Sequence, residues 1–187
     1  MRTARSVTPL ALLLVLGAAP AAAQQTAAGL VGDLVTDIEE VEGKLLGLAR
    51  TIPAEKWGWR PAEGVRSVHE VFKHVVADNY LIPAMAGTAA PAETGIRGDA
   101  YQTALDFENR PLTRDETIAQ LESSFAHLKA ALRATSESAM SETVPLGRNQ
   151  ASKRYLWLLA ATHVHEHLGQ MIAYARSNGV VPPWSRG

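Results

Sequence analysis

Four stretches of the chain place apolar residues at alternating spacings of three and four. The first covers residues 27–49, the second begins at Ser67, the third begins at Thr113, and the fourth covers residues 152–178. This spacing puts the apolar side chains on one side of an α-helix and leaves the polar ones on the other. The pattern therefore predicts four amphipathic helices whose apolar stripes face one another.

Helix boundary signals agree with this prediction. Ser67 with Glu70, and Thr113 with Glu116, have the spacing of a capping box, in which the two side chains satisfy backbone N–H groups at a helix start. Gly179 suits the position just after a helix end. No run of alternating β-branched residues indicates a sheet. The expected fold class is all-α, a four-helix bundle.

The connection between the second and third predicted helices is unusually long. Residues 87–112 are rich in Ala, Gly, Thr and Pro and have no sustained period. Adjacent helices are normally joined by fewer residues. The length predicts a crossover between the two halves of the bundle, or a lid over one end to which Tyr101, Phe107 and Arg110 contribute.

The other two connections differ from each other in composition. Residues 53–66 contain Trp57 and Trp59, which are expected to close one end of the bundle, with a substrate-facing role as the alternative. Residues 136–151 are polar and contain Pro145 and Gly147, so they are expected to form the next connection.

The N-terminal residues indicate where the protein is sent in the cell. Arg2 and Arg5 precede an apolar run over residues 10–19 and the alanines at 21–23, which is the order of a secretory signal peptide. We expect cleavage after Ala23, a bundle domain over residues 24–187, and export to a periplasm or to the outside. The alternative is a first helix that stays attached.

Charge and cysteine content exclude several kinds of function. The 187 residues carry 18 basic and 19 acidic side chains, and loss of Arg2 and Arg5 with the leader would leave 16 basic side chains. That balance argues against a nucleic-acid-binding protein. The absence of cysteine means that a metal site must use nitrogen and oxygen ligands.

Histidines supply the candidate metal ligands. His163 and His167 are four residues apart in the last predicted helix, which places both rings on the face that also carries Leu159 and Ala160. His74 lies in the apolar stripe of the second helix. A single inward histidine is more often a hydrogen-bonded core residue. Three together favour a metal site that keeps a fourth position for water or substrate.

Three polar residues near these histidines are candidate catalytic residues. Asp78 lies one helical turn after His74, while Glu166 and Gln170 lie beside His167. Each could orient an imidazole N–H or accept a proton. The ligands do not fix the metal, because zinc, nickel, copper and iron all accept imidazole nitrogen.

Three motifs occur in an order that resembles a known family. They are the segment 59–74, which begins Trp-Arg-Pro and ends His, the segment 163–170, His-x-x-x-His-x-Gly-Gln, and the segment 176–183, which ends Pro-Pro. In their order and spacing they look like the DinB-like superfamily, which includes the YfiT-type metal-dependent hydrolases. The resemblance covers essentially the whole chain after the leader.

The resemblance implies a four-helix bundle with a long crossover after the second helix. It also implies a divalent metal ion, most often zinc or nickel, bound by the positions that match His74, His163 and His167. Some members of the family are thiol S-transferases that use low-molecular-weight thiols.

The expected function is that of an exported divalent-metal-binding protein which catalyses transfer of the thiol type, or hydrolysis, on a small substrate. The alternative is a bundle without enzymatic activity that only binds a metal or another ligand. The expected partner is a small molecule, without nucleic acid and without a membrane after leader cleavage. The protein is expected to be a monomer or a homodimer.

Overall fold

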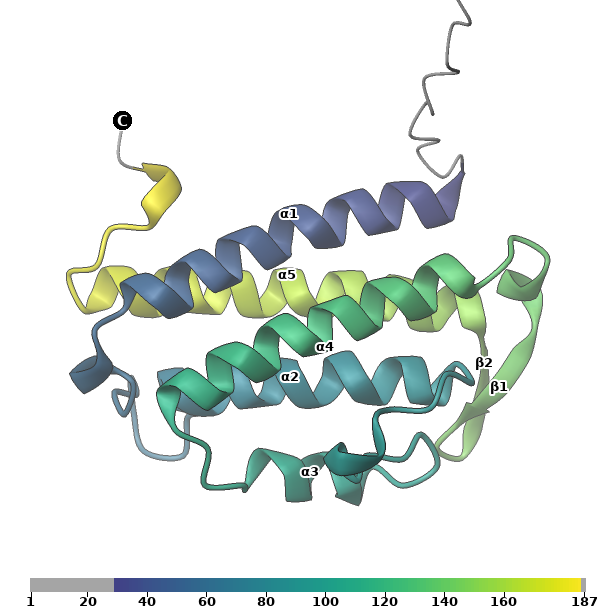
Figure 1. Ribbon diagram of the computed structural model, residues 1–187, viewed down its shortest axis with the longest axis horizontal. Coiled ribbons are helices and arrows are strands. Elements are labelled where there is room, and N and C mark those ends of the chain that lie inside the picture. Colours follow the sequence, from purple (N-terminus) through teal and green to yellow (C-terminus); the bar gives the residue numbers. More distant parts are fainter. Residues whose placement is uncertain (1–28, 186–187) are drawn as a thin grey trace, which may run out of the picture.

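The computed structural model describes residues 29–185, so the signal peptide predicted for residues 1–23 lies outside the described residues. It contains five α-helices and one two-stranded hairpin (Figure 1). The elements are α1 (Leu30–Thr51), α2 (Val68–Met85), α3 (Gln102–Glu108), α4 (Arg114–Ala134), β1 (Thr143–Leu146), β2 (Asn149–Ser152) and α5 (Lys153–Ser177).

The four long helices form a bundle. Helix α1 packs against α4 and α5, and α2 packs against the same two helices, so α1 and α2 occupy opposite corners. Figure 1 shows α1 and α5 running in one direction and α2 and α4 in the other. Because α2 and α4 are parallel neighbours, the chain must return along the bundle between them. The predicted helical bundle and its long connection are confirmed, with α3 as a short helix inside that connection.

The bundle interior is filled by the apolar stripes. Its largest fully buried side chains include Leu45, Leu48, Phe72, Phe125, Leu128 and Trp157. Burial of each such side chain contributes roughly 1.5–3 kcal/mol before the cost of ordering it. This packing fixes the spacing between α2 and α5, the helices that carry the candidate ligands.

The predicted helix boundaries agree with the structure. The hydroxyl of Ser67 accepts the backbone N–H of Glu70 at 3.2 Å, and the Glu70 carboxylate accepts the N–H of Ser67 at 2.6 Å. Thr113 and Glu116 form the same reciprocal pair at the start of α4. Gly179 has φ +74°, the left-handed conformation that follows a helix end without strain only at glycine.

Residues 136–151 connect α4 with α5 as predicted, but the expectation that no segment forms a sheet was wrong. Strands β1 and β2 pair antiparallel around Gly147, whose φ is +58°. Pro145 faces Gln150 in this ladder, and Leu146 faces Asn149. The strands have four residues each and mix polar with apolar side chains without regular alternation, so the usual strand pattern was absent.

The long connection is held to the bundle by specific contacts. Phe107 of α3 is 2% exposed and therefore belongs to the core. The guanidinium of Arg110 donates to the carbonyl oxygens of Glu93 and Thr94 and lies over the Phe107 ring. These two residues fasten the connection. Tyr101, the third residue predicted for a lid, is 57% exposed at the start of α3.

Of the two tryptophans before α2, Trp57 packs on α2 and Trp59 packs on α5. Trp57 is 4% exposed and stacks on Phe72, with ring centroids 5.1 Å apart. Trp59 meets Tyr174 edge to face at 5.2 Å. The interpretation that this segment closes one end of the bundle is confirmed.

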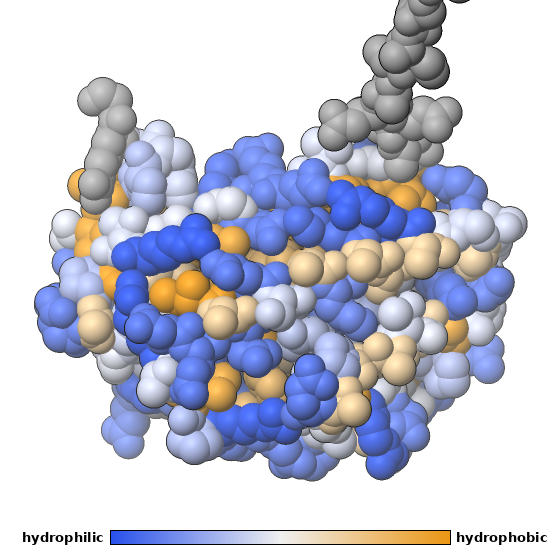
Figure 2. Space-filling view, in the orientation of Figure 1, coloured by the Kyte–Doolittle hydropathy of each residue, from blue (hydrophilic) through white to orange (hydrophobic). Residues whose placement is uncertain are grey.

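One face of the bundle is mainly hydrophilic (Figure 2). Hydrophilic residues cover most of the face seen in Figure 2, and the apolar residues between them form separate small patches. Among residues 29–185, no helix is both long enough and apolar enough to cross a membrane.

Candidate metal centre

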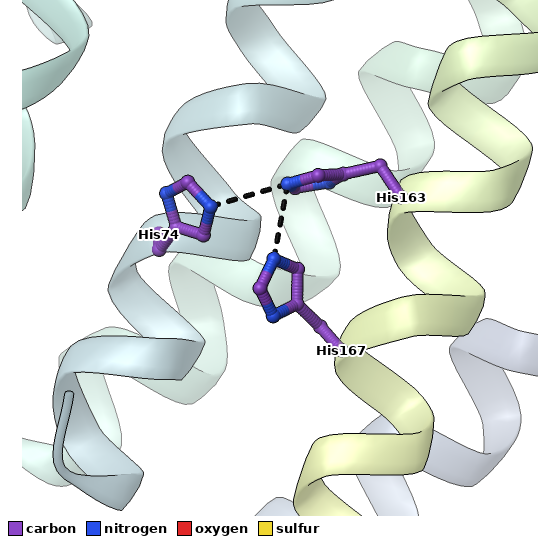
Figure 3. A group of neighbouring side chains, drawn as sticks. All are labelled: His74, His163 and His167. Atoms are coloured by element: carbon purple, nitrogen blue, oxygen red, sulfur yellow. Dashed lines mark hydrogen bonds between the residues drawn. The ribbon is translucent and has the colours of Figure 1, made fainter. Parts of the chain in front are cut away.

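Three histidine rings meet at one point between α2 and α5. The Nε2 atom of His163 lies 3.2 Å from Nε2 of His74 and 3.1 Å from Nε2 of His167. The candidate ligand atoms of all three residues lie within 4.8 Å of one another. Figure 3 shows His74 pointing from α2 toward the other two rings, which project from α5. The structure brings together the three predicted ligands, although 89 residues separate His74 from His163.

The spacing of these nitrogens fits a metal ion. A tetrahedral ion with metal–nitrogen bonds of about 2.0–2.1 Å requires ligand nitrogens about 3.4 Å apart. The two Nε2 distances at His163 are within a few tenths of an ångström of that value. The rings are also shielded from bulk water, since His74 and His167 are each 7% exposed. The residues present therefore fit a divalent ion.

Hydrogen bonds on the far side of two rings set which nitrogen carries the proton. Nδ1 of His74 lies 2.8 Å from a carboxylate oxygen of Glu108, and Nδ1 of His167 lies 2.8 Å from the amide oxygen of Gln170. Both oxygens only accept, so each Nδ1 must donate its proton. In the neutral rings, Nε2 of His74 and of His167 is then unprotonated and directs a lone pair at the common point. Convergent lone pairs of this kind fit a bound cation.

Asp78 places a carboxylate beside the same point. Its Oδ2 lies 3.0 Å from Nε2 of His163 and 3.8 Å from Nε2 of His74. Its Oδ1 is buried without a hydrogen-bond partner among the described residues, and so is Nδ1 of His163. Orphaned buried polar atoms are uncommon and indicate a place where a bound group belongs.

The electrostatics favour the neutral form of His167 and the ionised form of Asp78. Burial lowers the pKa of His167 to about 4, and the neighbouring His163 and His74 act in the same direction. Burial alone would raise the pKa of Asp78, but the hydrogen bond and charge of His163, with the charges of His74 and His167, hold it below its usual value. Neutral imidazoles and an ionised carboxylate are the forms that bind a metal.

A chain of hydrogen bonds connects the outer partners of the rings. The Gln170 side-chain N–H donates to the Tyr174 hydroxyl at 2.9 Å, and that hydroxyl donates to the Arg66 carbonyl at 3.1 Å. The Arg66 guanidinium donates to the second carboxylate oxygen of Glu108 at 3.2 Å. Arg66 thus links the group behind His167 with the group behind His74.

The candidate catalytic residues differ in where the structure puts them. Asp78 lies beside the rings, and Gln170 lies behind His167. Glu166 is exposed on the outer side of α5, and within residues 29–185 it acts on His167 through its charge and not through a hydrogen bond. It lies one residue before His167, which is about 100° around the helix from that ring, and this explains its outward direction.

Glu108 was missed from the sequence. It is the last residue of α3, a helix of seven residues inside a segment without a hydrophobic period. Its carboxylate is 13% exposed and is shared between His74 and Arg66. A carboxylate next to the buried Phe107 was the one signal that could have identified it.

Tyr101 lies near the carboxylates of the candidate centre. Partial burial raises the pKa of its phenol, and the charges of Asp78 and Glu108 raise it further. Its side chain is more than half exposed.

Comparison with known proteins gives a consistent picture. The family model described as the DinB superfamily matches residues 37–171. No curated protein matches the chain. A DinB-like protein from Bacillus subtilis superposes with a TM-score of 0.61 at 19% identity, over 80% of this chain and 93% of that chain.

Two further solved structures are similar. YfiT from Bacillus subtilis, described as a probable metal-dependent hydrolase with an unusual four-helix bundle topology, has a TM-score of 0.60 at 15% identity, over 81% of this chain and 89% of that chain. A mycothiol-dependent maleylpyruvate isomerase has a TM-score of 0.59 at 16% identity, over 76% of this chain and 61% of that chain. At these identities the likeness shows the fold alone.

Proposed function

The chain belongs to the DinB superfamily, and from this premise we propose that it is an exported enzyme that uses a divalent metal ion on His74, His163 and His167. The reaction is a transfer of the thiol type or a hydrolysis on a small substrate. One observation carries the proposal: hydrogen bonds from the rings to Glu108 and Gln170 leave two Nε2 lone pairs directed at a point that the third ring also faces.

The chemistry follows from what surrounds that point. Three protein ligands leave a position for a nucleophile, and a bound divalent ion supplies the acidity that brings the pKa of water or a thiol toward neutrality. Asp78 is ionised, lies within 3.0 Å of His163, and has one oxygen without a partner among the described residues. We assign Asp78 the role of accepting the proton of the nucleophile.

The other side chains hold the site in place. His74 and His167 keep their Nδ1 protons in hydrogen bonds to Glu108 and Gln170, and a bound ion would occupy both Nε2 lone pairs, so neither ring would then accept the proton. Core packing of α2 and α5 keeps the two halves of the site at a fixed distance. Zinc and nickel are the ions that we propose. The similarity to a probable metal-dependent hydrolase and to a mycothiol-dependent isomerase supports the hydrolytic and the thiol-dependent reaction.

Metal analysis tests the centre itself. Protein purified without added metal should contain close to one equivalent of a divalent ion, and His163→Ala should lose it. His165→Ala is the matched control, because His165 lies on the same helix but is exposed and bonds to Asp37. A protein without metal, or a His163→Ala variant that binds as well as the parent, would contradict the proposal.

Activity separates an enzyme from a binder. The metal-loaded protein should be assayed with thiols against a panel of electrophiles, and in parallel with ester and amide substrates. Asp78→Asn should keep the metal and lose about 10²–10⁴-fold in rate, because a positioned proton acceptor contributes that much. Equal rates in the two proteins would remove Asp78 from the mechanism, and no turnover in any assay would favour the non-enzymatic alternative.

Export is a separate part of the proposal. The basic residues, apolar run and small residues before Gln24 support a cleaved leader. Mass determination of the protein recovered from the periplasm or medium of a bacterial host should give a chain that begins at Gln24. Recovery of the uncleaved chain in the cytosol would contradict it.

A further inference from the structure

A cavity of about 350 Å³ lies next to the metal centre on the far side of the His74 ring. It is lined by Arg60, Gly64, Val65, Arg66, Glu70, Lys73, Glu108 and Asn109. Glu108 forms part of its wall and also bonds His74, so one carboxylate and one imidazole ring separate the cavity from the point where the three Nε2 atoms meet. Its volume is at the lower end of the range for small-molecule sites.

The carboxylates of this cavity are already engaged. One oxygen of Glu70 accepts from Arg60 and the other from the backbone N–H of Ser67. One oxygen of Glu108 accepts from His74 and the other from Arg66. Every oxygen of these two carboxylates therefore already has a donor from the protein.

The cations of the cavity retain free donors. The ammonium of Lys73 donates to the carbonyl oxygen of Arg110 at 3.1 Å, and within residues 29–185 no carboxylate lies within ion-pair distance of it. An ammonium has three N–H donors, and a guanidinium has five. Arg66 uses one of its guanidinium nitrogens on Glu108. With three cations against two carboxylates, the cavity carries a formal charge of +1 and an excess of donors.

We propose that this cavity binds a small oxyanion, a carboxylate or a phosphate, through Lys73 and Arg66. The inference goes beyond the proposed function and stands independently of it. Oxyanion groups match the geometry of a guanidinium fork and the charge of an ammonium. The binding step itself does not depend on the metal.

The test uses inorganic phosphate and succinate as separate probes, titrated into isotope-labelled protein and followed by NMR. Both should shift the backbone resonances of the cavity residues in a saturable manner, and the probe with the lower Kd identifies phosphate or carboxylate as the preferred group. Lys73→Gln should weaken that binding at least tenfold, while Lys73→Arg, which keeps the charge, should retain most of it. Far-UV circular dichroism checks that each variant is folded.

Lys44→Gln is the matched control, since it removes the same charge from an exposed pair with Glu40 on α1. It should leave the affinity unchanged. Shifts spread over all surface lysines, or an equal loss in Lys44→Gln and Lys73→Gln, would overturn the proposal. If Lys73→Gln fails to fold, the positions of the shifted resonances in the parent protein provide the test. Saturable shifts that occur only outside the cavity would also overturn the proposal.

The same titration on His163→Ala separates this inference from the proposed function. That variant should bind phosphate or succinate with the parent's affinity although it has lost the metal ligand. If the parent protein binds the anion but has neither metal nor turnover, the proposed function is contradicted and the anion site is supported. If the parent protein binds metal and turns over substrate but phosphate and succinate do not bind in the cavity, the anion site is contradicted and the proposed function is supported.

Discussion

Two imidazole rings of the candidate centre, His74 and His167, owe their direction to the partner of the nitrogen that faces away from the centre. For His74 that partner is Glu108, a carboxylate that Arg66 holds in turn. Outer partners of this kind fix the ring and raise the basicity of the ligand nitrogen. The strength of metal binding should therefore depend on residues that never touch the ion.

Glu108→Ala should lower the metal affinity about 10–100-fold, because the His74 ring loses both its anchor and the negative charge behind it. Glu108→Gln keeps an acceptor oxygen and should lose less. Competition against a chelator of known affinity measures both. Asp106→Ala, an exposed acidic residue on the same helix that pairs with Gln102, serves as control and should bind as the parent does. Parent-like affinity in Glu108→Ala would show that His74 is oriented by packing alone.

The buried His167 makes the metal-free protein sensitive to acid. Its pKa is lowered from 6.5 to about 4, so between these values the unfolded chain binds a proton that the folded protein does not. Stability should fall as the pH decreases from about 6.5 to about 4, by at most about 3 kcal/mol. Urea unfolding at several pH values measures this. His167→Gln should show a shallower decline, and an unchanged slope would assign the effect to other groups.

The three histidines could be predicted as candidate ligands from the sequence, but the residues that hold them in place, such as Glu108 and Arg66, could not. His163 and His167 stand one turn apart on an inward face, and His74 occupies an apolar stripe, so helical periodicity alone identifies all three. Glu108 and Arg66 lie outside any long helix, and their contacts depend on how the connection folds back. Periodicity carries no information about such contacts.

Among the elements, the crossover that contains α3 has the most demanding fit to its neighbours. A Cβ atom at Gly98 would lie 2.3 Å from the backbone carbonyl carbon of Ala84, at the end of α2. Only a residue without a side chain permits this approach. The close contact holds the connection, and with it Glu108, against α2.

Gly98→Ala should therefore destabilise the protein by about 1–3 kcal/mol, the usual cost of overpacking, and should displace the connection. Gly43→Ala should change the free energy of unfolding in the opposite direction. Gly43 lies in the middle of α1, and among residues 29–185 no atom outside α1 itself would lie within 4 Å of an added Cβ there. That substitution should raise stability by about 0.5–1 kcal/mol. Thermal unfolding compares the two, and a neutral Gly98→Ala would mean that the connection moves freely on α2.

Element boundaries were predictable where they depend on local chemistry. Both capping boxes, and the glycine that follows α5, were visible as residue spacings. The hairpin of β1 and β2 was not, because four-residue strands containing Pro145 and Gln150 lack the composition of a strand. Its pairing is a consequence of the turn and of the two helices it joins.

At the scale of the whole molecule, the metal centre joins two helices that pack through an apolar interface. His74 belongs to α2 and the other two ligands belong to α5, so a bound ion would hold the two helices together in the folded state. Any ligand that binds only the folded protein adds to its stability. Metal occupancy and unfolding are therefore linked.

Zinc at a free concentration 100 times its Kd should raise the free energy of unfolding by about 2.7 kcal/mol. For a chain of this size the Tm should rise by about 5–10 °C. A chelator should reverse the change. His163→Ala should not respond to zinc, whereas His165→Ala should respond fully. Equal responses in these two variants would place the stabilising ion elsewhere.

Helix α5 supplies two of the three imidazoles and is the last helix of the bundle to leave the ribosome. A nascent polypeptide that ends before it holds a single ligand, so the ion cannot be captured during synthesis. Loading must wait until the full chain has folded, and the metal that the protein carries will reflect the ions present in the compartment where folding is completed.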